Sequence, residues 1–370
     1  MVGAFGQIYQ GRRVLVTGHT GFKGGWLVLW LRLLGAEVSG YAIPPTGSES
    51  LFSLLGEDTF RHSWLADIRD ADAVKEAVVA SAPDIIFHLA AQPIVGASYR
   101  APLDTLSTNA MGTAILLEAI REARSPAAVV VVTSDKCYRN ENTGRPFQEH
   151  DPLGGDDVYS MSKAATELVV AAWHASFFSK DAGLGPLATA RAGNVIGGGD
   201  YAEDRIVPDA VRAHVEGRPL FLRRPQATRP WQHVLEPLSG YLRLGQSLLA
   251  SPDKARLWNF NFGPEGAAER TVQELVEAWL AAWPHSMEVQ TGPLPPYGEA
   301  VRLSLDHSQA ARELAWRPVW DFQRTVEETA TWYRERHERQ ASAALMLALT
   351  QRQIEAYAQD AAAAGVSWAR

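Results

Sequence analysis

The sequence predicts an α/β fold: a doubly wound parallel sheet with a smaller C-terminal domain built over the strand ends. Three observations lead to this fold class. Short runs rich in β-branched residues are apolar at every position, they alternate with helical stretches, and the first run leads into a glycine-rich loop. Runs that are apolar on both faces are typical of parallel strands covered by helices on both sides. Right-handed crossovers are expected between such strands.

The elements follow one another in a βα order. Helical stretches are expected at residues 26–34, near 108–123 and from 325 onward, and residues 340–365 are alanine-rich enough to predict a long terminal helix. The predicted strands are residues 13–17 (RVLVT), 37–42, 84–90 (DIIFHLA), 127–133 (AAVVVVT) and, returning late to the sheet, 257–262.

Prolines become frequent after Val195, which suggests shorter elements and a second domain. We expect a dinucleotide-binding Rossmann-type domain over residues 1–195, with returning segments near 232–263. A mainly substrate-binding domain is expected over residues 196–335, and a helical tail over 336–370.

The amino-acid composition limits the classes of function that the protein can have. The 370 residues are 46% hydrophobic and 21% charged, as in an ordinary globular protein, and the net charge of -7 argues against a nucleic-acid or anionic membrane surface. The single cysteine, Cys137, excludes an intrachain disulfide and a cysteine-based metal site, and no metal is expected. Residues 1–11 lack the features of a signal peptide, so a cytoplasmic location is expected.

The loop Gly18-His-Thr-Gly21-Phe-Lys-Gly24 follows the first strand directly. Glycines there allow a tight turn and close approach to a pyrophosphate, which the next helix N-terminus would bind. The GxxGxxG spacing is the form used by short-chain dehydrogenases; the alternative is a glycine-rich turn without a ligand. Cofactor contacts are therefore expected from Gly18, Thr20, Gly21, Phe22, Lys23 and Gly24.

The choice of cofactor depends on the segment after the second strand. Residues 40–48 hold neither an acidic residue for a ribose 2′-hydroxyl nor an arginine for a 2′-phosphate, so the fingerprint is incomplete. The lack of a cation there favours NAD over NADP, although His19 or Lys23 would be an alternative partner for that phosphate. Asp67, just past the expected third strand, is placed to meet the adenine or is a solvated loop residue.

Tyr159 and Lys163 form a YxxxK pair, and no other tyrosine of the chain has lysine four residues later. Residues four apart share a helix face, so we expect the ammonium of Lys163 to lower the pKa of the Tyr159 phenol. Ser134, Asp135 and Lys136 follow the strand 127–133, at the sheet edge where ligands bind. The alternative for Asp135 and Lys136 is a surface ion pair in a turn. Cys137 is interpreted as a small filler residue.

These motifs together resemble an extended short-chain dehydrogenase/reductase of the NAD-dependent epimerase/dehydratase family, within it the CDP-D-glucose 4,6-dehydratases. The resemblance covers most of residues 8–335. It rests on VTGHTGFKGGWL (16–27), HLAAQPIV (88–95), TSDKCY (133–138), YSMSK (159–163), RAGNVIGGGD (191–200) and RPWQHVLEPLSGY (229–241).

The resemblance implies an NAD-dependent lyase acting on CDP-glucose, in a homo-oligomer. It makes Tyr159 the base with Lys163 as its partner, Asp135 the acid for the departing 6-hydroxyl and Lys136, as neutral amine, the base at carbon 5. Position 136 departs from the glutamate of the wider dehydratase pattern. Further cofactor contacts are implied for Asp67, Ile68, Leu89, Ala90, Ala91 and Thr108, and substrate contacts for Gln92, Asn194, Arg205, Arg229 and His233.

Some alternatives stay open. Arg229 would otherwise belong to a structural ion pair. The protein would otherwise be another nucleotide-sugar epimerase or dehydratase on the same scaffold, which keeps Tyr159 and Lys163 without needing Asp135 and Lys136. A non-catalytic NAD-binding protein would have no reason to hold the tyrosine–lysine pair.

Overall fold

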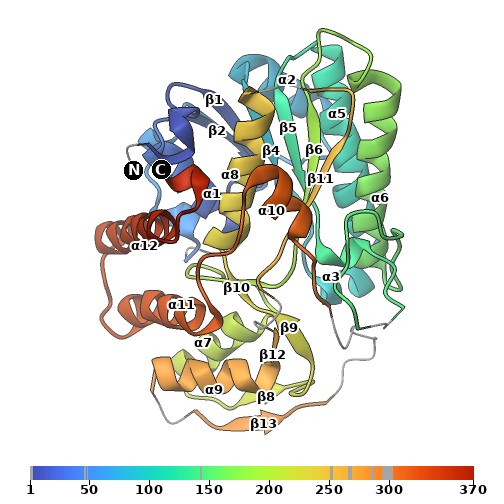
Figure 1. Cartoon of the computed structure of the whole chain (residues 1–370). Coiled ribbons are helices and arrows are strands. Elements are labelled where there is room, and N and C mark those ends of the chain that lie inside the picture. Colours follow the sequence, from blue (N-terminus) through green and yellow to red (C-terminus); the bar gives the residue numbers. More distant parts are fainter. Residues whose placement is uncertain are drawn as a thin grey trace.

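The structure, a computed structural model, describes residues 3–45, 47, 49–141, 144–250, 253–265, 269–284, 287–293 and 303–370. Its main body is a seven-stranded sheet in the order β11-β6-β5-β4-β1-β2-β3, in which every neighbouring pair is parallel (Figure 1). The predicted fold class is confirmed. The strands are β1 (Arg13–Thr17), β2 (Glu37–Ala42), β3 (His62–Leu65), β4 (Ile85–His88), β5 (Ala128–Val132), β6 (Leu187–Ala192) and β11 (Trp258–Phe262).

Helices cover both faces of this sheet. On one face α1 and α8 form a core with the terminal helix α12, and on the other α2, α5 and α6 form a second core. The helices are α1 (Phe22–Leu33), α2 (Ala71–Ser81), α3 (Val95–Arg100), α4 (Pro102–Leu106), α5 (Gly112–Glu122), α6 (Val158–Trp173), α7 (Ile206–Glu216), α8 (Leu235–Ala250), α9 (Val272–Ala282), α10 (Ser308–Leu314), α11 (Phe322–His337) and α12 (Ala343–Ala363).

Single turns complete the helical elements. Two π-helical turns, η4 (Ser107–Met111) and η6 (His174–Phe178), join α4 to α5 and extend α6. The 3₁₀ turns are η1 (Ala4–Gln7), η2 (Leu51–Leu54), η3 (Glu57–Thr59), η5 (Asp135–Cys137) and η8 (Ser367–Ala369).

Two local differences from the prediction have physical causes. Helix α1 begins at Phe22 rather than at residue 26, because its first turn contains Gly24 and Gly25 and the apolar pattern starts only after them. Strand β6 was not predicted although it is buried at every position, because Thr189 and Arg191 interrupt its apolar run. The predicted late strand is confirmed as β11, which pairs with β6.

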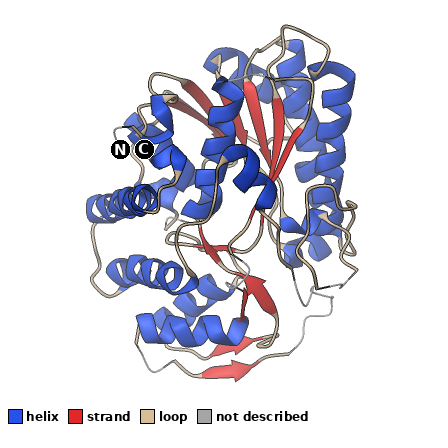
Figure 2. Cartoon of the chain, viewed as in Figure 1, coloured by secondary structure: helices blue, strands red, loops and turns tan. Residues whose placement is uncertain are grey.

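The smaller lobe lies beyond one end of the sheet (Figure 2). Since β6 runs through β7 into this lobe, the lobe covers the carboxyl ends of the strands, where ligands bind in such sheets. We propose that residue 195 is the boundary between the sheet domain and this smaller lobe. Short strand pairs form the lobe and its junction: β7 (Val195–Ile196) with β10 (Gln232–His233), β9 (Thr228–Pro230) with β12 (Glu269–Thr271), and β8 (Leu220–Leu222) with β13 (Val289–Thr291).

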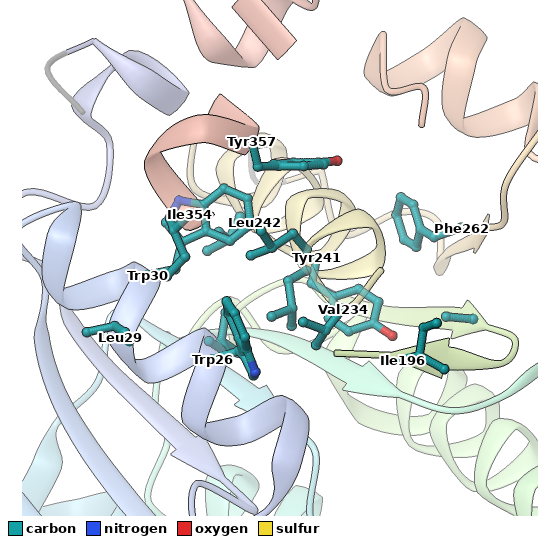
Figure 3. Close-up of a cluster of buried hydrophobic side chains, with 14 of the residues drawn as sticks. Trp26, Leu29, Trp30, Ile196, Val234, Tyr241, Leu242, Phe262, Ile354 and Tyr357 are labelled. Atoms are coloured by element: carbon teal, nitrogen blue, oxygen red, sulfur yellow. The ribbon is translucent and has the colours of Figure 1, made fainter. Parts of the chain in front are cut away.

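The terminal helix α12 packs back onto the main body. Figure 3 shows Ile354 and Tyr357 of α12 in one cluster with Trp30 of α1 and Leu242 of α8. The Tyr357 hydroxyl also donates a 2.7 Å hydrogen bond to Glu236 in the first turn of α8. Among the residues described, no helix has the length and apolar character needed to cross a membrane.

Candidate active site

The glycine-rich loop after β1 is folded too tightly for other residues. Gly18 has φ +76°, and a Cβ there would lie 2.7 Å from the backbone nitrogen of Ala90, while a Cβ on Gly24 would lie 2.1 Å from the carbonyl oxygen of Gly18. Gly21 caps α1 without any side chain, so the N–H groups of the first turn stay available to an anion. This loop therefore fits a dinucleotide, because a pyrophosphate needs both a close backbone approach and free N–H donors.

His19 and Lys23, the two alternative partners for a 2′-phosphate, do not provide a positive charge beside β2. His19 lies against Gly40 of β2 and bonds to the Ser63 hydroxyl at 2.9 Å, but burial lowers its pKa to about 4, so the ring is neutral. The ammonium of Lys23 faces the Tyr241 ring, 6.0 Å from the centroid, and burial, followed by the charges of Arg205 and Lys163, lowers its pKa to about 7. Residues 46 and 48 of this segment lie outside the described residues.

The loops after β3 and β4 form the next part of the site. Asp67 pairs with Arg69 at 2.6 Å, and the hydrogen bond from Arg69 holds the pKa of that carboxyl below its usual value. Ile68 is buried against Gly112, where a Cβ would lie 2.7 Å from it. Leu89, Ala90 and Ala91 follow β4 beside Gly18, and Thr108 lies half-buried in η4.

Asn109, for which no role was predicted, connects the loop after β4 to α6. Its side-chain oxygen accepts a 2.8 Å hydrogen bond from the backbone N–H of Gln92, and its side-chain nitrogen donates one of 2.8 Å to the Ser162 hydroxyl. The amide of Gln92 itself is engaged with Thr105 and Ile94.

Tyr159 and Lys163 lie one turn apart near the start of α6, whose N-cap Asp157 accepts from the Ser160 N–H. Burial raises the pKa of Tyr159 to about 12, partly offset by the hydrogen bond with Ser134 and the charge of Arg205. Burial also lowers the pKa of Lys163 to about 8. The expected lowering of the Tyr159 pKa by Lys163 is not found, because burial of the phenol dominates and Ser134 and Arg205, not Lys163, partly offset it.

Ser134 connects this pair to the second acid–base pair. Its hydroxyl donates to Oδ1 of Asp135 at 2.9 Å and accepts from the backbone N–H of Lys136 at 3.2 Å. Oδ2 of Asp135 is buried with no hydrogen-bond partner in the described chain, and it faces Gly193. Lys136 is half-buried, and Cys137 is fully buried with its pKa raised by burial, as expected of a filler residue.

Three of the four later substrate candidates lie in segments near Tyr159 or Asp135. Asn194 follows β6 and has a buried side-chain oxygen that lacks a partner among the described residues. Arg205 pairs with Asp200 at 2.8 Å, and its charge acts on Tyr159. Arg229 is buried in β9 and donates to the Thr228 carbonyl at 2.8 Å.

His233 is not brought to the site. Its ring is fully buried between Trp26 and Trp320, at 5.7 and 4.9 Å between ring centroids, and burial lowers its pKa to about 3. A neutral ring inside the core supports the junction of the two lobes rather than reaching a ligand. The substrate contact of His233 was implied by the resemblance alone, and a sequence motif does not reveal which of its side chains point into the core.

Comparisons with known proteins show the family to which the chain belongs. The model of the GDP-mannose 4,6 dehydratase family matches residues 15–329. The chain is 43% identical over 332 residues to the CDP-glucose 4,6-dehydratase of Salmonella typhimurium, covering 88% of this chain and 91% of that protein. It is 27% identical to the dTDP-glucose 4,6-dehydratase of Haemophilus influenzae, covering 86% and 97%.

The chain is also similar in structure to solved nucleotide-sugar dehydratases and epimerases. The dTDP-glucose 4,6-dehydratase of Streptomyces venezuelae, solved with NAD bound, is 27% identical with a TM-score of 0.75, covering 88% of this chain and 98% of that chain. A UDP-glucose 4-epimerase from Stenotrophomonas maltophila, at 24% identity and a TM-score of 0.77, covers 89% and 100% and shows the fold alone.

Proposed function

Because the chain belongs to the GDP-mannose 4,6-dehydratase family, we propose that it is an NAD-dependent CDP-glucose 4,6-dehydratase. The observation that carries this proposal is the position of Ser134, which donates to Asp135 and lies close enough to Tyr159 to lower its pKa, so that the two acid–base pairs are neighbours. Oxidation alone needs only the first pair. Loss of water from carbons 5 and 6 needs a second base and a second acid, and these stand beside the first pair.

The chain's own side chains would carry four proton transfers. Ionised Tyr159 removes the proton of the sugar 4-hydroxyl, and the ketone that results acidifies the proton on carbon 5. The neutral amine of Lys136 accepts that proton. The bond between carbon 6 and its oxygen then breaks, and Asp135 donates a proton to the oxygen, so that water leaves. The glycine loop would hold NAD, which would supply the acceptor for the hydride of carbon 4 and the donor of that hydride to carbon 6. Lys136 then returns a proton to carbon 5, which completes the product.

The orphaned oxygen of Asp135 supports this assignment of the acid. As the acid, Asp135 donates from this oxygen to the oxygen of the sugar 6-hydroxyl, so the sugar supplies the partner that the buried oxygen lacks in the described chain. Gly193 supports it further, because a Cβ there would lie 3.0 Å from the same oxygen and would compete with the sugar for the space. Asn194, Arg205 and Arg229 are the proposed contacts to the nucleotide sugar, and Asp67, Ile68, Leu89, Ala90, Ala91 and Thr108 are proposed to line the NAD site.

Isotope transfer tests the proposed function. CDP-glucose deuterated at carbon 4 should give a product deuterated at carbon 6, with one solvent hydrogen at carbon 5 and no net consumption of NAD. A 4-epimerase would return the label to carbon 4, a simple dehydrogenase would accumulate NADH, and a non-catalytic protein would transfer nothing. Mixing labelled and unlabelled substrate shows whether transfer stays within one molecule, and scrambled label would contradict the proposal.

The assembly and location complete the proposal. We propose a homo-oligomer in the cytoplasm. Large exposed apolar side chains on the packed helices α4 and α6 support a partner on that side, since Leu103 is 80% and Leu168 is 59% exposed. Light scattering of the purified protein gives its mass in solution, and a monomer at micromolar concentration would contradict this part.

A further inference from the structure

One buried ion pair holds both ends of the segment that carries Ser134, Asp135 and Lys136. At the start of the segment the Thr133 hydroxyl donates to Oε1 of Glu167. At its end, the guanidinium of Arg191 donates to the Tyr138 hydroxyl at 2.7 Å and lies 5.0 Å from the centre of that ring. The pair itself is bidentate, with Nε 2.9 Å from Oε1 and the second nitrogen 2.7 Å from Oε2.

The ion pair is almost fully withdrawn from solvent and its polar atoms are engaged. Glu167 and Arg191 are each 2% exposed. The carboxylate also accepts from Thr189 at 2.9 Å, and the guanidinium also donates to the Glu149 carbonyl at 2.9 Å. Burial raises the pKa of Glu167, but the charge and hydrogen bonds of Arg191 outweigh it and hold that pKa below its usual value.

A gain in stability alone does not explain why the protein has a buried ion pair here. Removing two charges from water costs several kcal/mol per ion in real proteins, and well-packed apolar residues often replace a buried pair at no loss. A fork of parallel hydrogen bonds, in contrast, fixes the orientation of whatever is attached to it. The side chains attached here are Thr133 and Tyr138, which bracket the second acid–base pair.

The other end of the connection is the helix of the first acid–base pair. Glu167 lies four residues after Lys163 and eight after Tyr159 on α6, so the three side chains share one face of the helix. The ion pair therefore joins the helix that holds Tyr159 and Lys163 to the segment that holds Asp135 and Lys136. Tyr138 is held further by a 2.7 Å hydrogen bond to Asn261 of β11 and by stacking on Phe147.

We propose that Glu167 and Arg191 are positioning residues that set the two acid–base pairs at the separation required by one sugar. This inference rests on the proposed function. It predicts a specific failure: when the connection is cut, oxidation at carbon 4 continues, but elimination across carbons 5 and 6 lags behind it. Misplacement of a catalytic group by about 1 Å is enough to cost a large factor in rate.

The test compares two threonines that bond to the same carboxylate. Thr133→Val cuts the connection to the catalytic segment, whereas Thr189→Val removes a hydrogen bond to Glu167 from strand β6, outside that segment. Tyr138→Phe cuts the other end and keeps the ring stacking, so it serves if Thr133→Val fails to fold. Each variant is loaded with NAD and mixed with CDP-glucose. Absorbance at 340 nm then reports oxidation, and solvent deuterium at carbon 5 reports the second base.

We expect Thr133→Val and Tyr138→Phe to lower kcat about tenfold, with KM within about twofold and with transient 340 nm absorbance that the parent lacks. Thr189→Val should stay within about twofold and show no such absorbance. A readout independent of turnover is amide hydrogen exchange in a peptide covering residues 134–137, which should rise only in the first two variants.

Three outcomes would overturn the inference. Equal loss of kcat in Thr133→Val and Thr189→Val would make the ion pair a structural element only. A fall in kcat without 340 nm absorbance would mean that oxidation and elimination are not separated, and a fall without faster exchange would mean that residues 134–137 are not loosened. If the parent protein transfers no label from carbon 4 to carbon 6, the proposed function fails first, and the inference fails with it.

Discussion

The Ser134 hydroxyl donates a 2.9 Å hydrogen bond to one oxygen of Asp135, and the other oxygen of that carboxyl is buried with no partner in the part of the chain that the structure describes. Since Ser134 also lowers the pKa of Tyr159, the oxidising and the eliminating halves of the proposed site adjoin at this hydroxyl. The free oxygen marks where a substrate hydroxyl would be received.

The first prediction concerns Tyr159. Tyr159→Phe should keep the fold and NAD binding but lower kcat by about a hundredfold or more, because the base at the 4-hydroxyl is lost. Because burial raises the pKa of this phenol to about 12, and the base acts only when ionised, kcat/KM of the parent should rise with pH toward the alkaline range. Tyr99→Phe, on the surface of α3, is the matched control; a variant at position 159 with parental turnover would remove Tyr159 from the mechanism.

The second prediction concerns Lys136, where the sequence departs from the wider dehydratase pattern. Lys136→Ala should slow the exchange of the carbon-5 proton with solvent by about a hundredfold, while reduced cofactor still forms. Proton NMR of the product made in heavy water measures this exchange. Lys75→Ala, in a half-exposed pair with Glu122 on the far helices α2 and α5, should behave as the parent. Exchange at the parental rate in Lys136→Ala would assign the base to another group.

The third prediction tests the cofactor loop. Gly24→Ala places a methyl group 2.1 Å from the Gly18 carbonyl oxygen, so the start of α1 must move away from the loop. We expect NAD affinity to fall about tenfold or more, which is about 1.4 kcal/mol, as measured by calorimetry. Gly56→Ala is the control, because a Cβ there meets nothing within 4 Å. Equal affinity in the two variants would show that the loop does not need this close approach.

The fourth prediction concerns Glu236, whose buried carboxyl contacts α12, and the pH dependence of the free energy of unfolding. Burial raises the pKa of Glu236 to about 7, although N–H donors from Trp320 and Val319 and the Tyr357 hydroxyl lower it in part. The folded protein therefore keeps a proton that the unfolded chain releases, and the free energy of unfolding should fall as pH rises from about 4.5 to 7, by up to about 3 kcal/mol. Glu236→Gln should remove this slope in thermal unfolding, and exposed Glu355→Gln should not. An unchanged slope in Glu236→Gln would assign the pH dependence elsewhere.

Local patterns gave the sheet and the first acid–base pair, because both depend on residues close in sequence. Strand β5 is apolar throughout and was predicted, and Tyr159 and Lys163 are four residues apart on one helix. The polar connection between Glu167 and Arg191 was not predicted, because its partners are 24 residues apart and their spacing carries no pattern. The same limit explains His233, whose inward orientation depends on Trp26 and Trp320, far away in sequence. The comparisons confirm the resemblance and NAD as the cofactor, whereas the individual site residues stay predictions.

The position of Cys137 has a practical consequence. It is the one cysteine in the 370 residues, and it lies fully buried between Lys136 and Tyr138, with burial raising the pKa of its thiol well above the usual range. A thiol reagent can react with it only when the segment opens, because reaction needs an accessible thiolate. Labelling kinetics of the unmodified protein therefore measure the opening of the catalytic segment without any introduced probe, and bound substrate should slow them in proportion to its occupancy.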